Sequence, residues 1–234
     1  MKLGIIGAME IEVESLVAKL QDRVITEKAG SAFYEGTLNG MKAVVVRCGV
    51  GKVNAALCVQ ILCDCFDVTH VINTGIAGSL NVDLDIGDLV VSRDVIHHDF
   101  DCRIFGYAMG QVPGMGVAAF PADEKLASVA FGAAQTVHPE HVRKGRIASG
   151  DQFISSPEQK RKIIADTDAV CAEMEGAAIA QAAYRNGIPF VIIRAISDKA
   201  DDSAQMDYPT FEAIAAKRCA KVTETLAEML LRDN

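Results

Sequence analysis

Short apolar runs alternate along the chain with longer segments of helical spacing, and this alternation restricts the fold more than any other feature. Lys2–Gly7 and Phe190–Ile196 have the length and apolarity of strands buried on both faces. Ala8–Leu20 instead repeats its apolar residues at the period of an amphipathic helix. Strands that alternate with helices are typical of α/β folds. The sequence therefore predicts an α/β fold with a central mixed, twisted β-sheet flanked by helices, and a single domain spanning residues 1–234.

The remaining elements continue this alternation. Asn39-Gly40 lies between two strand-like runs and is a preferred pair for a two-residue hairpin turn, so we expect an antiparallel hairpin there. The glycine-interrupted stretch Cys102–Phe120 is predicted to be a long loop, and such loops tend to be lids or binding segments. The Ala-rich run after Glu175 is predicted to be helical. Further strands are predicted at Ala32–Leu38, Lys42–Cys48, His70–Asn73, Asp88–Ser92, Val142–Ala148 and Asp168–Cys171, and further helices at Val53–Cys65, Asp123–Thr136, Pro157–Ile164 and Thr210–Leu231.

Composition argues against several classes of function. A net charge of −8 is unfavourable for binding DNA or RNA, because like charges repel. No apolar run approaches the ~18 residues that suggest a membrane-spanning helix, and Met1–Gly7 is too short for a signal peptide. The seven cysteines are odd in number and contain no Cys-x-x-Cys pair. Reduced thiols in a cytoplasmic protein are therefore expected.

Two motifs suggest a cofactor or a metal, and neither meets the requirements. Gly49–Lys52 lacks the glycine at Val46 and the hydroxyl at Val53 that a phosphate-binding loop needs. His97-His98-Asp99 places adjacent histidines on different sides of a strand or loop, and no further cluster of ligands follows. We expect neither a cofactor nor a metal site.

Acidic side chains follow several of the predicted strands. Glu175 lies where a short strand ends and a helix begins, and ligands bind at that edge of open α/β sheets. The alternative for Glu175 is an ordinary acid in a first helical turn, favoured by the helix dipole. Glu12 and Asp198 also follow predicted strands, as do Gly75–Gly78 and Phe153-Ile154. Three acids with few cations nearby suit a neutral ligand whose transition state becomes positive, as in glycosidic bond cleavage.

Some choices remain open from the residues alone. Periodicity does not decide whether Glu10 or Glu12 faces a cleft, and Phe153 fits either a stacking role or the core. Arg194 lies inside a buried strand and must find a carboxylate, for which Glu173 and Glu175 are the candidates.

Taken in order, the motifs closely resemble the 5′-methylthioadenosine/S-adenosylhomocysteine nucleosidases, members of the purine nucleoside phosphorylase superfamily. The resemblance runs nearly end to end. It is carried by Gly4-Ile5-Ile6-Gly7-Ala8-Met9-Glu10, Gly49-Val50-Gly51-Lys52-Val53-Asn54, Asn73-Thr74-Gly75-Ile76-Ala77-Gly78, Phe105-Gly106-Tyr107, Ala119-Phe120-Pro121-Ala122-Asp123, Ser149-Gly150-Asp151-Gln152-Phe153-Ile154, Glu173-Met174-Glu175 and Arg194-Ala195-Ile196-Ser197-Asp198.

This resemblance implies a nucleoside phosphorylase-like fold and hydrolysis of the N-glycosidic bond between adenine and a 5′-thio-substituted ribose. Asp198 would be the general acid at adenine N7, Glu12 would activate the attacking water, and Glu175 would hold the ribose hydroxyls. An aspartate at its reference pKa of about 3.9 is a poor proton donor at neutral pH, so this role requires a raised pKa. The implied partners are small adenosine thioethers, with no cofactor.

The same resemblance assigns the other substrate contacts. Phe153 would stack on adenine, the backbone of Ile154 would read the adenine edge, and Met174 would pack against the ribose. The pocket for the alkylthio group would be lined by Met9, Val50, Cys102, Phe105 and Tyr208, and the remaining contacts would come from Gly78, Arg194 and Ser197. Pro113 would reach in from a second subunit, which predicts a homodimer. Many relatives carry Ser in place of Ile76, and Ser197 would then orient Asp198.

Three alternatives accompany this interpretation. A phosphorylase would need cations around phosphate, whereas the segment after the first strand offers the acids Glu10 and Glu12. A nucleosidase for another 6-aminopurine nucleoside, such as aminodeoxyfutalosine, would differ only in its substrate. A nucleoside-binding sensor without turnover would not need a base that activates water, so the presence of all three carboxylates argues against it.

Overall fold

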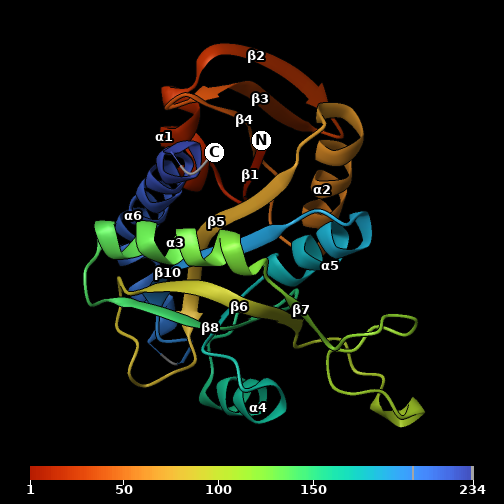
Figure 1. Cartoon of the computed structure of the whole chain (residues 1–234). Helices are drawn as coiled ribbons and strands as arrows, with labels where there is room; N and C mark the ends of the chain where they lie inside the picture. The colour runs from red at the N-terminus through yellow and green to blue at the C-terminus, as the bar shows by residue number, and fades with distance from the viewer. Residues whose placement is uncertain (202, 233–234) are drawn as a thin grey trace.

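A ten-stranded mixed sheet forms the centre of the computed structural model, which describes residues 1–201 and 203–232 except for the side chains of residues 205 and 206 (Figure 1). The strands are β1 Leu3–Gly7, β2 Gln21–Lys28, β3 Ser31–Leu38, β4 Met41–Arg47, β5 His70–Ser79, β6 Leu89–His97, β7 Ala119–Pro121, β8 Val142–Ser149, β9 Cys171–Glu173 and β10 Phe190–Asp198. The helices are α1 Glu10–Lys19, α2 Lys52–Phe66, α3 Glu124–Val137, α4 Pro157–Thr167, α5 Gly176–Asn186 and α6 Ala204–Arg232, with a short 3₁₀ helix, η1, at Arg103–Phe105.

The sheet combines a closed ring of strands with an open arm. Its order is β10-β6-β8-β9-β5-β1-β4-β3-β2, and β10 also pairs with β5, so β5, β10, β6, β8 and β9 close on themselves. Strands β1, β5 and β10 run parallel to one another, whereas β9 runs antiparallel to the end of β5. The predicted mixed sheet is confirmed. Its closure into a ring was not predicted, because pairing between distant strands leaves no local pattern.

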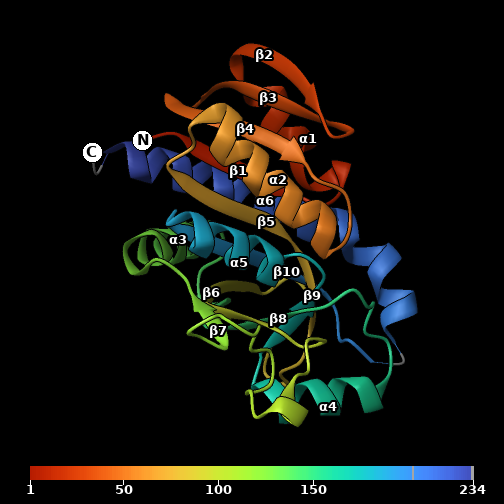
Figure 2. The same cartoon turned by 90° about the vertical axis from the view of Figure 1, so that its right-hand side faces the viewer.

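Helices cover both faces of this sheet, as predicted. One apolar core lies beneath α1, α3 and α6, and a second lies beneath α2 and α5 (Figure 2). Buried Val and Ile side chains of the strands alternate between these two cores; Ile5 joins the first and Ile6 the second. Strands buried on both faces therefore have continuous apolar runs. Within the described ranges, no helix combines the length and the apolarity that crossing a membrane requires.

The predicted hairpin is present. Asn39 and Gly40 have φ values of 49° and 88°, as a type I′ turn requires, and Leu38 pairs with Met41 across it. Strand β2 extends this hairpin into a three-stranded antiparallel edge and was missed by the sequence analysis. Its residues Gln21–Lys28 are almost all exposed. An exposed edge strand buries no alternating apolar face, so it lacks the pattern from which strands are predicted.

Several predicted boundaries were wrong. Asp168 does not begin a strand; it ends α4 in the left-handed conformation, with φ 56°. Strand β5 does not end at Asn73 but continues through Gly75–Gly78 to Ser79. Helix α6 begins at Ala204, ahead of Pro209. There Ser203 Oγ donates to Asp207 Oδ2 over 2.6 Å, which helps to stabilise the first turn.

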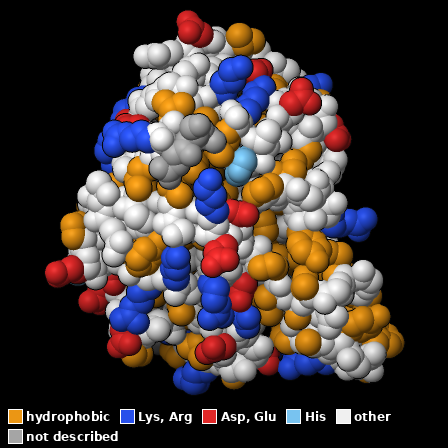
Figure 3. Space-filling model, in the orientation of Figure 1, with side chains coloured by type: hydrophobic (Ala, Val, Ile, Leu, Met, Phe, Trp, Pro, Cys, Tyr) orange, Lys and Arg blue, Asp and Glu red, His pale blue; other side chains and the backbone are white. Residues whose placement is uncertain are grey.

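The long segment between β6 and β7 leaves the body of the molecule, as expected for the predicted loop. It lies at the lower right of Figure 1 and contains η1 but no further helix or strand among its described residues. Ile104 and Phe105 are 88% and 76% exposed. Figure 3 shows apolar side chains gathered over this segment. Exposed large apolar groups of this kind mark interaction surfaces.

Candidate active site

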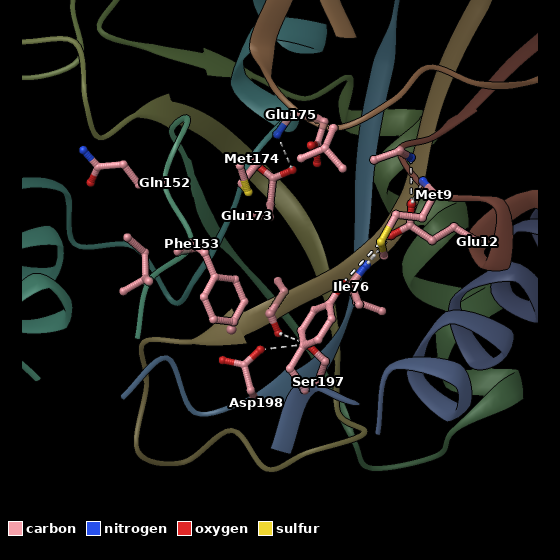
Figure 4. Close-up of a pocket in the computed structure, with 17 residues that line it drawn as sticks. Met9, Glu12, Ile76, Gln152, Phe153, Glu173, Met174, Glu175, Ser197 and Asp198 are labelled. Atoms are coloured by element: carbon pink, nitrogen blue, oxygen red, sulfur yellow. Dashed lines mark hydrogen bonds between the residues drawn. The ribbon is translucent and has the colours of Figure 1, made fainter. Parts of the chain in front are cut away.

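One cavity collects residues from segments that lie far apart in the sequence (Figure 4). It is lined by Ala8, Met9, Glu12, Val50, Ile76, Ala77, Gly78, Gln152, Phe153, Ile154, Ala172, Glu173, Met174, Glu175, Ser197, Asp198 and Tyr208. The cavity lies beyond the carboxyl ends of β1 and β10. Strand β9 reaches it from the opposite direction, with Ala172 facing Gly78 of β5. The three predicted acids Glu12, Glu175 and Asp198 therefore share one cavity.

Glu12 lies in the first turn of α1, and backbone N–H groups hold its carboxylate. Its Oε2 accepts hydrogen bonds from Ala8 N and Met9 N at 2.7 and 2.9 Å, and its Oε1 accepts from Ile76 N at 3.1 Å. Burial raises the pKa of Glu12, although Arg194 and these N–H groups favour the charged form. Glu10 is exposed and faces Arg47 at 3.6 Å. Of the two candidates, Glu12 is the acid in the cavity.

Glu175 is the residue immediately before α5, at the junction that the sequence indicated. Its Oε1 accepts a hydrogen bond from Gly51 N at 2.8 Å, which fastens the loop before α2 to the cavity. Burial, together with the negative charge of Glu173, raises the pKa of Glu175 to about 8. The carboxyl group thus holds a proton more tightly than an exposed glutamate does.

Arg194 finds its carboxylate in Glu173, one of the two predicted partners. The guanidinium forms a buried ion pair with Glu173 and also donates to Asn73 Oδ1 and to the carbonyl of Ile193. Burial alone would raise the pKa of Glu173, but Arg194 and the hydrogen bonds from Ser149 and Gly176 N together outweigh burial and lower that pKa. Arg194 was predicted to contact substrate, but it is not among the residues that line the cavity. Its charge lies behind the cavity, neutralising Glu173.

Glu173 is also tied to the start of α5. It accepts hydrogen bonds from Ser149 Oγ and from Gly176 N, the latter at 2.8 Å to Oε2. Ser149 Oγ in turn accepts from Ala177 N at 2.7 Å. These contacts fix the helix end that bears Glu175. Ser149 and Glu173 both belong to motifs named from the sequence, but their role in fixing the start of α5 was not predicted, because contacts between residues far apart in the sequence leave no local pattern.

Asp198 is the last residue of β10 and faces the cavity from the side opposite Glu175 (Figure 4). Its Oδ2 accepts a hydrogen bond from Ser197 Oγ at 2.9 Å, and its Oδ1 accepts from Ala200 N at 2.8 Å. Burial raises the pKa of Asp198 in spite of these two donors. Ser197 therefore orients Asp198 in the way expected for a chain with Ile76 in place of serine.

Apolar and aromatic side chains complete the cavity wall. The rings of Phe153 and Tyr208 meet edge to face, with centroids 5.5 Å apart. Tyr208 Oη donates to Met9 Sδ at 3.3 Å. Predicted residues Val50, Gly78, Ile154 and Met174 also line the cavity, whereas Ala8, Ile76, Ala77, Gln152 and Ala172 line it without having been predicted. Except for Gln152, the residues that were not predicted are small or aliphatic, so their side-chain chemistry did not mark them as part of a site.

Three predicted residues are absent from the cavity of the same chain. Cys102, Phe105 and Pro113 all belong to the segment between β6 and β7, which extends away from the body (Figure 1). A role for Cys102 and Phe105 in the alkylthio pocket of their own subunit is therefore not supported. Pro113 was expected to act on a second subunit.

The His97-His98-Asp99 motif forms no cluster of metal ligands. His97 Nε2 pairs with Gln181 Oε1 at 2.9 Å, and burial lowers the pKa values of both histidines. Elsewhere in the described part of the chain, Asp88, His138 and His141 bring three potential ligand atoms together. The two imidazole rings are stacked, however, with an interplanar angle of 16°. Their in-plane lone pairs therefore do not converge on one point.

The cavity combines carboxylates with apolar and aromatic side chains. Among the described residues that line it, none is Lys, Arg or His. A flat apolar group fits against Phe153, and hydroxyl groups can donate to Glu12 and Glu175. Carboxylates aimed into a water-poor cavity stabilise positive charge that develops there. The arrangement suits a neutral molecule with a flat ring and a polyol that becomes cationic during reaction.

Comparison with known proteins agrees with this geometry. Residues 2–228 match the family model described as the phosphorylase superfamily. A 5′-methylthioadenosine/S-adenosylhomocysteine nucleosidase from Exiguobacterium sp. is 45% identical over 98% of this chain and 99% of its own length. The nucleosidase from Colwellia psychrerythraea, solved in complex with adenine, has a TM-score of 0.95 and 40% identity over 98% of this chain and 96% of that one.

A third relative comes from Neisseria meningitidis, solved in complex with methylthio-immucillin-A. It has a TM-score of 0.93 and 40% identity, covering 97% of this chain and 98% of that one. The fold and the cavity thus define the chain as a member of the phosphorylase superfamily. Within that superfamily, the chain belongs to the 5′-methylthioadenosine/S-adenosylhomocysteine nucleosidase family. It is an enzyme of the N-glycosyl hydrolase type.

Proposed function

We propose that the chain hydrolyses the N-glycosidic bond of 5′-methylthioadenosine and S-adenosylhomocysteine, releasing adenine and the 5-thio-substituted ribose. One observation supports this most strongly: Glu12, Glu175 and Asp198 line a single cavity beside Phe153, without a cation in its described lining. The family to which the chain belongs and the ligands of its relatives, adenine and a methylthio-immucillin, favour the same substrates.

Asp198 is the proposed general acid. It donates a proton to adenine N7, so the base leaves as a neutral molecule. A carboxylic acid can do this near neutral pH only if its pKa lies above the usual value. Burial raises the pKa of Asp198, which supports the assignment. Ser197 positions the carboxyl group through its hydrogen bond to Oδ2.

Glu12 is the proposed general base, which takes a proton from the attacking water. A base is more effective when its pKa approaches the working pH, and burial raises the pKa of Glu12. The backbone N–H groups of Ala8, Met9 and Ile76 hold its carboxylate in place. Because these donors belong to the rigid junction of β1 and α1 and to β5, the base needs no rearrangement.

Glu175 is proposed to accept hydrogen bonds from the ribose hydroxyls and to stabilise the positive sugar, with Met174 packed against the ring. The proton held by Glu175 in the free enzyme is released to solvent water when positive charge develops on the sugar beside it, because a nearby positive charge favours the carboxylate. Phe153 stacks on adenine, and the backbone of Ile154 reads the adenine edge. Met9, Val50 and Tyr208 enclose the alkylthio group.

We further propose that residues 1–234 work as a single nucleoside phosphorylase-like domain in a cytoplasmic homodimer. In that homodimer, Cys102, Phe105 and Pro113 of one subunit complete the alkylthio pocket of the other. The exposure of Ile104 and Phe105 favours this arrangement, as does that of Val53 on α2, which is 80% exposed. The burial of such side chains drives protein association.

Product chromatography tests the reaction directly. Incubation with 5′-methylthioadenosine in phosphate-free buffer is expected to release adenine. A requirement for added phosphate would instead identify a phosphorylase. Tight binding of an adenosine analogue without release of adenine would identify a sensor. Comparison of kcat/KM between 5′-methylthioadenosine and aminodeoxyfutalosine distinguishes the two nucleosidase alternatives.

A further inference from the structure

Three charged residues from three separate connections meet beside the cavity. Lys52 begins α2, Asp99 follows β6, and Asp151 follows β8. Lys52 Nζ lies 2.6 Å from Asp99 Oδ1, and Asp99 Oδ2 accepts a hydrogen bond from Asp151 N at 2.9 Å. Asp151 Oδ1 accepts from Lys52 N at 2.8 Å, which closes the circle. Each residue contacts the other two.

Two glycines lie directly beside these three charged residues. A Cβ atom on Gly51 would lie 3.2 Å from Asp151 Oδ1, and the φ of Gly51 is +99°. A Cβ atom on Gly150 would lie 3.0 Å from Asp99 Cγ and would also collide with the His98 ring. Backbone therefore approaches the charged groups more closely than other residues would allow. Such close approach indicates that the loop positions are fixed by the contact.

The contacts among Lys52, Asp99 and Asp151 connect two parts of the cavity wall. On one side, Gly51 N–H donates to Glu175, the carboxylate proposed to hold the ribose. On the other side, Asp151 lies two residues before Phe153, the ring proposed to stack on adenine. Phe153 is 46% exposed, so burial in the core does not fix it. The contacts of Asp151 anchor this loop on the side before Phe153, and Ser155 N, which donates to Gln159 Oε1 at 3.4 Å, anchors it on the side after Phe153.

The ion pair between Lys52 and Asp99 is partly buried. The side chains of Lys52 and Asp99 are 19% and 17% exposed. Partial burial opposes ionisation of Asp99, yet the hydrogen bonds from Lys52 and Asp151 N outweigh it and lower the pKa of Asp99. Asp99 is therefore held in its charged form, and a partly buried pair is screened by salt less than an exposed pair.

We propose that Lys52, Asp99 and Asp151 form a clamp that sets the distance between the adenine-stacking loop and Glu175, and so determines how well the base and the ribose are held together. The inference rests on the proposed function of Phe153 and Glu175. These three are positioning residues, since none of them lines the cavity. Small displacements of positioning groups have large effects on rate, about 100-fold for a 1 Å misplacement.

The test uses Lys52→Met in the full-length enzyme. We expect kcat/KM for 5′-methylthioadenosine to fall by about 10-fold to 100-fold, and the affinity for adenine, measured by calorimetry, to fall with it. Lys52→Arg, which keeps the charge, should retain most of both. The matched control is Lys162→Met, which removes a lysine from a 2.7 Å pair with Asp166, a residue that is 17% exposed, as Asp99 is. This control should behave as the wild type does.

A double-mutant cycle with Asp99→Asn separates a clamp from a general loss of stability. In a clamp, the double variant Lys52→Met/Asp99→Asn is little worse than either single variant, because both remove the same contact. Additive losses, or a Lys52→Met enzyme that matches Lys162→Met in turnover and adenine binding, would overturn the clamp. A wild type that binds adenine but does not release it from 5′-methylthioadenosine would contradict the proposed function instead, and the adenine affinities would still test the clamp.

Discussion

Glu12 is the side chain on which the proposed water activation depends, and Glu10 offers a control two residues away. Glu12→Gln should lower kcat by about 100-fold to 10,000-fold, the usual contribution of a general base. Glu10→Gln should leave kcat unchanged, because Glu10 faces Arg47 at the surface. Steady-state kinetics, with the melting temperature of each variant, checks both. A Glu12→Gln enzyme with the wild-type rate would remove Glu12 from the mechanism.

Glu175 links activity to stability through its pKa. In the folded protein this pKa is raised to about 8 from an ordinary 4.5. The neutral carboxyl group of Glu175 therefore contributes fully to the stability of the fold when the pH is below the ordinary pKa of 4.5. This contribution is lost as the pH rises towards 8. Gln does not titrate, so Glu175→Gln should melt at a higher temperature than the wild type at pH 8, with a smaller difference at pH 5.

Other buried acids titrate in both proteins, so the difference between the two melting curves isolates Glu175. Glu14→Gln, on an exposed position of α1, is the control and should show no such trend. An unchanged difference between pH 5 and pH 8 would contradict the raised pKa. Turnover by Glu175→Gln should fall at both pH values, since the amide cannot stabilise a positive sugar as a carboxylate does.

Gly75 of β5 has no side chain, and this leaves room for Glu12, the proposed base. A Cβ atom there would lie 2.5 Å from Glu12 Oε1 and 2.9 Å from Arg194 Nη1. Gly75→Ala should therefore destabilise the fold by about 1–3 kcal/mol, the usual effect of overpacking, and should displace Glu12 and lower kcat. Gly116→Ala, which meets nothing within 4 Å, is the control. Urea unfolding checks the stability, and equal midpoints for the two variants would contradict this account.

The elements that the sequence predicted well are those whose signal is local. The Asn39-Gly40 turn sets its own φ values, and Asp123 caps α3 by accepting from Leu126 N at 2.8 Å. Strand β2 was missed because its pairing to β3 leaves its side chains exposed. Element boundaries were predicted wrongly where the local sequence pattern was weakest, as at Asp168, which follows the end of α4.

The candidate site divides in the same way. Asp198 and Glu175 follow a strand or begin a helix, so their positions were predictable from the sequence. Periodicity could not predict whether Glu10 or Glu12 faces the cavity, since both flank the same apolar stripe. Hydrogen bonds from the N–H groups of Ala8, Met9 and Ile76 to Glu12 decide it. Because burying an unpaired charge is costly, the sequence predicted that Arg194 pairs with Glu173 or Glu175, and the structure shows that the partner is Glu173.

At the scale of the whole molecule, the proposed homodimer requires that Phe105 of one chain complete the alkylthio pocket of the other. Phe105 is 76% exposed and absent from the cavity lining. If it serves a second subunit, Phe105→Asp should shift the proposed dimer towards monomer in sedimentation equilibrium and should lower kcat/KM. Val82→Asp is the matched control, because Val82 is 87% exposed but lies between β5 and β6. It should change neither quantity.

Mixing two defective enzymes tests whether the pocket is shared. Phe105→Ala should weaken the pocket of the partner subunit, whereas Glu12→Gln disables the site of its own subunit. In a mixed dimer, the Glu12→Gln subunit supplies its intact Phe105 to the subunit that keeps Glu12, and one complete site results. Activity should therefore rise after the two variants are mixed and allowed to exchange subunits. If Phe105 acted within its own chain, no site in the mixture would be complete, and the activity would stay at the average of the two variants. That outcome, in mixtures shown to contain mixed dimers, would rule out a shared pocket.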